Sequence, residues 1–193
     1  MITHISGKLV EKSPTNVVVD CNGIGYFIHI SLHTFSQLTN EEHVKLLTHF
    51  QVKEDAQQLY GFATSAEREI FRLLISVSGI GTNTARTMLS SLTPKQVREG
   101  IATEDVALIQ SVKGIGLKTA QRVIIDLKDK VLKIYDIDET VALSNNTNKD
   151  EALSALEVLG FAKKQSDRVV AKIIAQKPDA TVEIIIKEAL KNL

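Results

Sequence analysis

The chain has 193 residues, 44% of them hydrophobic, and its 23 basic residues balance 23 acidic ones to a formal net charge of zero. This length suits one domain or a few small ones, and the neutral charge excludes a simple polycation. No apolar run approaches the roughly 18 residues of a membrane span, and the first residues lack a signal segment. Because Cys21 is the only cysteine, an internal disulfide and a Cys-rich zinc site are excluded, and we expect a cytoplasmic chain.

Residues 1–62 predict a small β-barrel. Apolar residues alternate along 24–30 and 44–52, and a β-branched run over 15–20 leads into the turn residues 21–23. Some five short strands in this length are typical of an OB-fold. Six acidic side chains outnumber four basic ones here, which disfavours a single-strand binder with a basic groove.

Residues 63–133 predict helices and carry an excess of four positive charges. Thr64 and Glu67 fit a capping box at one helix start, and Pro94 after Thr93 marks another. A longer helix further on carries an apolar stripe, formed by Ala120, Val123, Ile124, Leu127 and Val131.

Residues 134–149 are rich in Asp, Asn, Ser and Thr, and predict a flexible linker. Residues 150–193 predict three short helices, separated at Gly160 and at Pro178. The apolar face of the first is formed by Ala152, Ala155, Leu156 and Leu159. A unit of about 45 residues is near the lower limit for independent folding, so its core must be compact.

A repeat at an offset of 35 residues is the strongest feature. Residues 73–92 match residues 108–127 at nine of twenty positions, and each copy predicts a helix, a Gly-Ile-Gly turn and a second helix. Paired glycines permit positive φ and leave the backbone bare, so the amides at the next helix start form an anion site. The middle residue, Ile80 or Ile115, is expected to anchor the turn in the core. A lone copy is more often only a helix C-cap, but two copies in the basic third of the chain favour phosphate binding.

The predicted phosphate site combines the turn backbones with nearby cations and two hydroxyls. Contacts of this kind carry no base information. The site comprises Gly79, Ile80, Gly81, Thr84, Arg86, Lys113, Gly114, Ile115, Gly116, Lys118, Thr119 and Arg122. Neither turn completes a dinucleotide-binding motif, and the second lacks the adjacent Gly-Lys pair of a P-loop, which argues against ATP hydrolysis at a Walker-type site.

The order of these parts resembles the RuvA family, the DNA-binding subunits of the bacterial Holliday-junction branch-migration complex. The similarity covers nearly the whole chain, and residues 48–62 carry its most specific stretch, with both Gly-Ile-Gly turns and Leu159-Gly160-Phe161. The resemblance implies an α+β multidomain fold of four parts: an OB-fold barrel over 1–62, a tandem helix-hairpin-helix domain over 63–133, the linker over 134–149 and a three-helix, ubiquitin-associated-like domain over 150–193.

The resemblance also implies a function in recombination and DNA repair. A homotetramer would hold a four-way junction open and square, with one tetramer or two on each junction, and each subunit would grip one arm. The C-terminal domain would recruit a RuvB-like AAA+ ATPase, and a RuvC-like resolvase is a further expected partner. No catalytic site, metal or cofactor is implied for this chain, because the partner motor uses the ATP and Mg²⁺.

Two further residue sets follow from the resemblance. Glu54 and Asp55 fall on an acidic pin that would face the crossover and repel phosphates, although an acidic pair in a loop is usually just a solvated hairpin tip. Candidates for motor binding, which also suit the core of their own domain, are Leu159, Phe161, Ile173 and Ile174. The family commonly has a lysine where this chain has Asn83, so the first turn is expected to hold phosphate more weakly.

A DNA glycosylase with a helix-hairpin-helix motif is the alternative. Such enzymes place a catalytic aspartate about twenty residues beyond the turn, and Asp136 lies at that distance from Gly116. However, base flipping needs a pocket that a small helical segment is poorly suited to provide.

Overall fold

Five strands close into a barrel in the order β1-β2-β3-β5-β4. The computed structural model describes residues 1–39, 42–140, 148–177 and 180–193, with the backbone alone for 132–140. The strands are β1 (His4–Lys12), β2 (Asn16–Cys21), β3 (Ile24–Ile30), β4 (His43–Val52) and β5 (Gln57–Phe62). β3 and β5 pair in parallel and the other neighbours pair antiparallel, so the predicted OB-fold barrel is confirmed.

Alternation along the strands fills the barrel. Val17, Val19 and Ile28 are fully buried, since every second side chain of a strand faces the interior. Gly61 belongs to β5, where a Cβ would lie 2.6 Å from a side-chain carbon of Ile28, so the close parallel pairing there requires glycine. Cys21 ends β2 and packs beside the barrel core.

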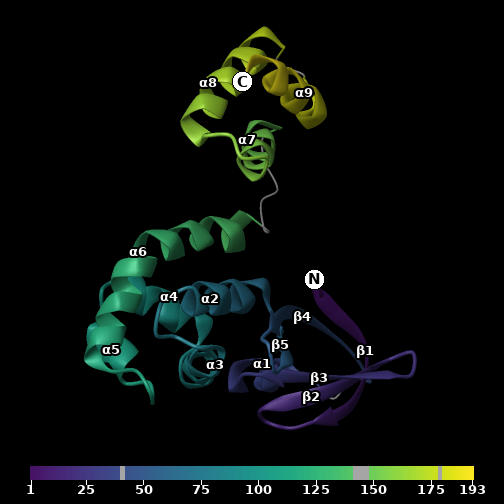
Figure 1. The fold of residues 1–193 in the computed structure, drawn as a ribbon, viewed down its shortest axis with the longest axis vertical. Coiled ribbons are helices and arrows are strands. Elements are labelled where there is room, and N and C mark those ends of the chain that lie inside the picture. The colour runs from purple at the N-terminus through teal and green to yellow at the C-terminus, as the bar shows by residue number, and fades with distance from the viewer. Residues whose placement is uncertain (40–41, 141–147, 178–179) are drawn as a thin grey trace. The chain divides into compact units, whose positions relative to one another are not determined.

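The helices that follow the barrel include two helix-hairpin-helix motifs (Figure 1). A short helix α1 (Leu32–Gln37) precedes β4, and the later helices are α2 (Ser65–Ile75), α3 (Thr82–Ser91), α4 (Pro94–Ala102), α5 (Val106–Gln110) and α6 (Leu117–Thr140). The capping box at Thr93 and Gln96 is present, with Pro94 at the helix start. The apolar stripe predicted for α6 is buried at all five positions.

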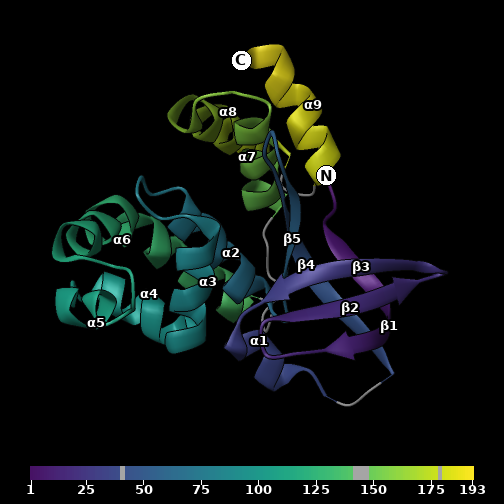
Figure 2. The same cartoon turned by 60° about the horizontal axis from the view of Figure 1, so that its bottom comes forward.

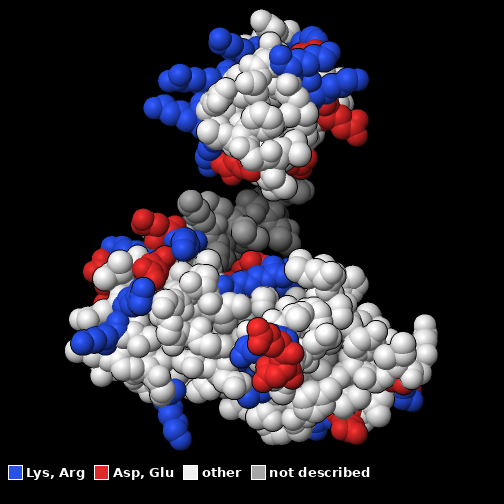
Figure 3. Space-filling model, viewed as in Figure 1, with Lys and Arg blue, Asp and Glu red and all other residues white. Residues whose placement is uncertain are grey.

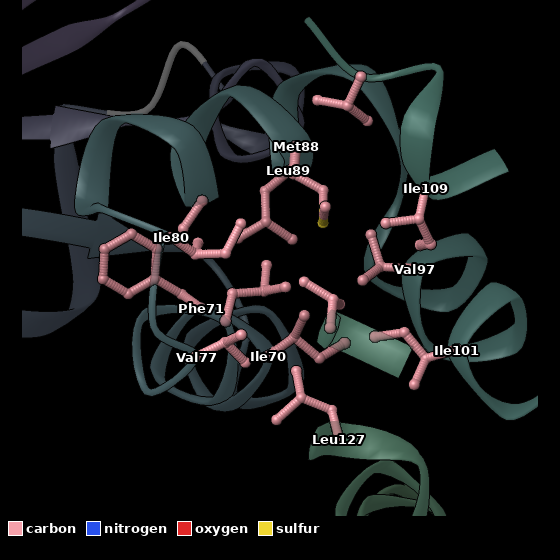
Figure 4. Close-up of a cluster of buried hydrophobic side chains, with 14 of the residues drawn as sticks. Ile70, Phe71, Val77, Ile80, Met88, Leu89, Val97, Ile101, Ile109 and Leu127 are labelled. Carbon is pink, nitrogen blue, oxygen red and sulfur yellow. The ribbon is translucent and has the colours of Figure 1, made fainter. Parts of the chain in front are cut away.

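The barrel and these helices share buried side chains. Figure 4 shows the helical core, in which Phe71 of α2 packs among apolar side chains from several helices. The ring of Phe71 also lies 5.2 Å from that of Tyr60 and 4.9 Å from that of Phe62, both on β5. Full burial of such a ring stabilises a fold by about 1.5–3 kcal/mol. Consistent with this shared packing, Met1–Asp138 form one compact unit, called the first unit below.

Glu67 corrects one sequence prediction. The Thr64 hydroxyl accepts from the Glu67 amide at 3.2 Å, which is half of the expected capping box. The Glu67 carboxylate, however, is fully buried and accepts hydrogen bonds from the hydroxyls of Ser31 and Thr34, the latter at 2.6 Å. It therefore joins α2 to α1 of the barrel, and burial raises the pKa of Glu67.

The predicted linker, residues 134–149, overlaps helices at both of its ends. Helix α6 continues to Thr140, because no glycine or proline interrupts residues 117–140, and residues 141–147 lie outside the described residues. The C-terminal unit (Glu139–Leu193) contains the three predicted helices α7 (Asn148–Val158), α8 (Lys163–Gln176) and α9 (Val182–Asn192).

Candidate nucleic-acid interface

The two Gly-Ile-Gly turns share one geometry. The first joins α2 to α3 and the second joins α5 to α6. Gly79 has a φ of 96° and Gly114 a φ of 93°, in the left-handed region that favours glycine. In each turn the isoleucine amide donates to the carbonyl of the valine three residues earlier, at 3.0 Å and 3.1 Å. The sequence repeat is therefore also a repeat of structure.

The middle isoleucines anchor both turns. Ile80 and Ile115 are each only 5% exposed and belong to the helical core, and Figure 4 shows Ile80 among these buried side chains. This part of the prediction is confirmed. Their amides, however, are already bonded within the turns, so the prediction that they donate to phosphate is corrected. The donors available to an anion belong to the residues around them.

The backbone beside each turn is open. A Cβ built at any of the four turn glycines would meet none of the described atoms within 4 Å. The first α-helical bonds after the turns run from Ala85 to Gly81 and from Ala120 to Gly116, both at 2.9 Å. The preceding amides at 82–84 and 117–119 therefore lack helical acceptors, and they lie at the positive end of the helix dipole. Each turn thus offers an approachable row of amide donors.

Cations surround the second turn. Lys113 and Lys118 are exposed on either side of it, and the Arg122 side chain is 57% exposed one helical turn further on. Arg122 also lies 3.7 Å from Asp126 of the same helix, which offsets part of its charge. On the face drawn in Figure 3, the Lys and Arg side chains of the first unit stand apart. The second turn therefore has three exposed cations close to it, and one of them is partly offset by an acidic neighbour.

The first turn lacks these cations. The positions that correspond to the three cations of the second turn hold Ser78, Asn83 and Thr87. Arg86 donates from Nη1 to the carbonyl of Thr15 at 3.2 Å and lies 3.3 Å from His29 Nδ1, so it contacts the barrel. Burial lowers the pKa of His29, as does the charge of Arg86, which favours a neutral imidazole beside the guanidinium.

The two hydroxyl candidates lie at helix starts, and the acidic pair lies at the tip of a hairpin. Thr84 and Thr119 are half-buried in the first turns of α3 and α6. Glu54 and Asp55 are exposed at the tip of the β4–β5 hairpin, which the amide of Lys53 closes by donating to Ala56 at 2.8 Å. Figure 2 shows this hairpin projecting beyond the barrel. Two carboxylates are thus presented to solvent at the end of a narrow arm.

Three family descriptions together match most of this architecture. Residues 1–61 match the RuvA N terminal domain, residues 71–129 a SAM-like helix-hairpin-helix tandem, and residues 147–193 the RuvA C-terminal domain. The whole chain is 66% identical to all of the Holliday junction branch migration complex subunit RuvA of Flavobacterium psychrophilum. The chain belongs to the RuvA family. Over the full length of both chains it is also 65% identical to RuvA of Christiangramia forsetii and 49% identical to that of Bacteroides thetaiotaomicron.

Family membership removes the glycosylase alternative, because RuvA is a non-catalytic subunit of its complex and uses no cofactor. Asp136, on which that alternative depended, lies in α6, and its side chain is outside the described residues. Among the residues whose structure is described, no group of three or more His, Cys, Asp and Glu side chains is placed to hold a metal ion. No helix in the same described ranges is long and apolar enough to cross a membrane.

The motor-binding candidates in the C-terminal unit differ in how exposed their side chains are. Leu159 is 57% exposed, because the chain turns at Gly160, whose φ is 94°. Ile173 is only 5% exposed and belongs to the core of the C-terminal unit. The prediction that Ile173 contacts the motor is therefore corrected. Phe161 and Ile174 are partly buried and pack against the same core. Val158 is 87% exposed beside Leu159, and sequence reasoning missed it because it lies off the apolar stripe of α7.

Proposed function

We propose that this chain is the junction-binding, non-catalytic subunit of a branch-migration complex in recombination and DNA repair. The observation that carries the proposal is the pair of matching turns with open backbone in the first unit. Membership of the RuvA family supports it, since the relatives compared are named as subunits of the Holliday junction branch migration complex. As such a subunit the chain acts on bacterial DNA in the cytoplasm.

The two turns bind the phosphates of one DNA arm. The amides before Ala85 and Ala120 donate to phosphate oxygens, and Lys113, Lys118 and Arg122 add charge at the second turn. These contacts ignore base identity, so one protein can hold any sequence that passes through it. The first turn holds phosphate by its amides, since Asn83 replaces a cation there. Domain 63–133 is therefore assigned to DNA binding.

A four-fold homotetramer built around the barrels of residues 1–62 suits a junction with four equivalent arms. The β4–β5 hairpins of the four subunits then meet near the centre, where Glu54 and Asp55 repel the phosphates of the crossover. Attraction along the arms with repulsion at the centre keeps the junction open and square. One tetramer covers one face of such a junction, and a second can cover the other face.

The C-terminal domain, residues 150–193, recruits a RuvB-like AAA+ ATPase through the exposed apolar side chains of Val158 and Leu159, next to the partly buried Phe161. Exposed apolar groups at the end of α7 suit a protein partner, since burying them on contact is favourable. ATP and Mg²⁺ then belong to the motor. An open junction with one uncovered face also leaves room for a RuvC-like resolvase.

A mobility-shift comparison tests the proposal. The full chain is titrated onto a synthetic four-way junction and onto linear duplex of the same sequence, at several salt concentrations, and native mass is measured with and without the junction. We expect tighter binding to the junction, weakening with salt, and a mass of four or eight chains on one junction. Equal affinity for both DNAs would refute the proposal.

A further inference from the structure

Thr82 connects the first turn to the barrel through buried hydrogen bonds. It is the first residue of α3, directly after Gly81, and is only 6% exposed. Its hydroxyl donates to Gln51 Oε1 at 3.2 Å, and the hydroxyl of Tyr60 donates to Thr82 Oγ1 at 2.9 Å. Gln58 Oε1 also lies 2.9 Å from the Tyr60 hydroxyl, whose single proton serves one of the two acceptors at a time.

These partners form the stem of the acidic hairpin. Gln51 on β4 and Gln58 on β5 lie opposite each other, one pair of residues before the strands end at Val52 and Gln57. The tip with the two carboxylates follows at once. The turn that offers amides to phosphate and the arm that carries the carboxylates are therefore joined by side-chain hydrogen bonds at their bases.

The second turn has no equivalent connection within the described part of the chain. The counterpart of Thr82 in the repeat is Leu117, which is 51% exposed and has no hydroxyl. The counterpart of Arg86, which binds the barrel carbonyl of Thr15, is the exposed Gln121. The repeat has therefore diverged: the first copy contacts the barrel where the second copy faces solvent.

We propose that Thr82 is a positioning residue, which sets the distance between the first phosphate-binding turn and the acidic tip. This inference rests on the proposed function. A linear duplex needs only the phosphate-binding turns, whereas a junction must meet the turns and the carboxylates together. A fixed spacing between attraction and repulsion therefore favours the junction, and loss of the Thr82 hydroxyl lowers the preference for junction over duplex more than it lowers affinity for duplex.

The test compares Thr82→Val, which removes the hydroxyl, with Thr82→Ser, which keeps it, in the full-length protein. The readout is the ratio of dissociation constants for duplex and four-way junction. We expect Thr82→Val to lower this ratio about fivefold, the factor that corresponds to one neutral hydrogen bond, while Thr82→Ser keeps the ratio of the unaltered protein. Thr103→Val is the matched control, since that hydroxyl bonds only within its own helix end at Glu99.

A double-mutant cycle with Tyr60→Phe tests the connection itself. If the two hydroxyls act as one unit, the double variant loses no more preference than Thr82→Val alone. An unchanged ratio in Thr82→Val, or an equal loss in Thr82→Ser, would overturn the inference, the latter because the shape of the side chain and not its hydroxyl would then be responsible. If the unaltered protein shows no preference for the junction, the proposed function itself fails.

Discussion

Replacing Lys118 with alanine tests whether the second turn supplies the ionic part of DNA binding. Lys118 is exposed beside an open backbone and forms no salt bridge with the described acidic residues. Each phosphate contact contributes about 0.9 to the slope of log affinity against log salt. We expect the variant to flatten that slope by about 0.9 for each subunit bound to DNA, and to weaken binding to all sequences alike. Fluorescence anisotropy with labelled junction DNA, at salt concentrations between about 50 and 200 mM, measures this slope.

The reciprocal change is Asn83→Lys, because Asn83 occupies the position of Lys118 in the first copy of the repeat and is equally exposed. A lysine there adds one contact and steepens the slope by about 0.9 for each subunit. Lys172→Ala in the C-terminal unit is the control, and its slope should not change. The reasoning is refuted if Lys118→Ala leaves the slope unaltered and Asn83→Lys also has no effect, since a side chain at either position would then not contact phosphate.

Three further sets of substitutions test the acidic pair, the first Gly-Ile-Gly turn and the buried Glu67. Replacing Glu54 and Asp55 together by glutamine removes repulsion at the crossover, so junction binding tightens and motor-driven migration changes, as a gel shift and a migration assay measure. Gly81→Ala places a methyl group on the open face of the turn at an ordinary φ of −87°, so DNA binding weakens with little loss of stability, whereas Gly79→Ala is strained and destabilises by about 1 kcal/mol in urea unfolding. Because the buried Glu67 carboxyl binds its proton more tightly in the folded chain, the parent loses stability as pH rises from the ordinary pKa of this group to its raised pKa. We expect Glu67→Gln, which cannot titrate, to abolish this pH-dependent loss.

Each of these changes has its own control or contrary result. Glu183→Gln, on an exposed acid of α9, controls for general loss of negative charge, and unchanged affinity and migration in the Glu54/Asp55 variant would discard the acidic pin. Wild-type DNA affinity in Gly81→Ala would show that phosphate does not approach that face. A stability profile for Glu67→Gln that stays parallel to the parent as pH rises above 4.5 would show that the pKa of Glu67 is not raised by folding.

Local patterns predicted the turns and part of the core. The first glycine of each Gly-Ile-Gly motif, Gly79 or Gly114, has nearly the same positive φ. The hydrophobic middle residue of the motif predicts the burial of Ile80 and Ile115. The start of α4 was also predictable, because the side chains of Thr93 and Gln96 each accept a hydrogen bond from the other residue's backbone amide. Features of this kind depend on residues within about four positions of one another, so the sequence contains all that determines them.

Contacts between distant residues were not predictable in the same way. Glu67 has the spacing of a capping residue, but its carboxylate instead meets Ser31 and Thr34, more than thirty positions away, once α1 covers it. Arg86 has the spacing of a phosphate ligand, yet it reaches the barrel at Thr15. A side chain that satisfies two local roles equally well is assigned only when the fold brings its distant partner close.

The divergence of the two copies follows from the same long-range packing. Once the barrel covers one side of α3, a polar side chain there must find a partner or lose its hydration, which is costly when it is buried. Thr82 and Arg86 meet this need with barrel acceptors, while their counterparts Leu117 and Gln121 remain exposed. The first copy therefore combines its proposed phosphate-binding turn with attachment to the barrel, and the cations lie at the second copy. Such a division suits a protein that must hold DNA in a defined place and still let it move, since backbone amides and few charges hold every step of the duplex with equal strength.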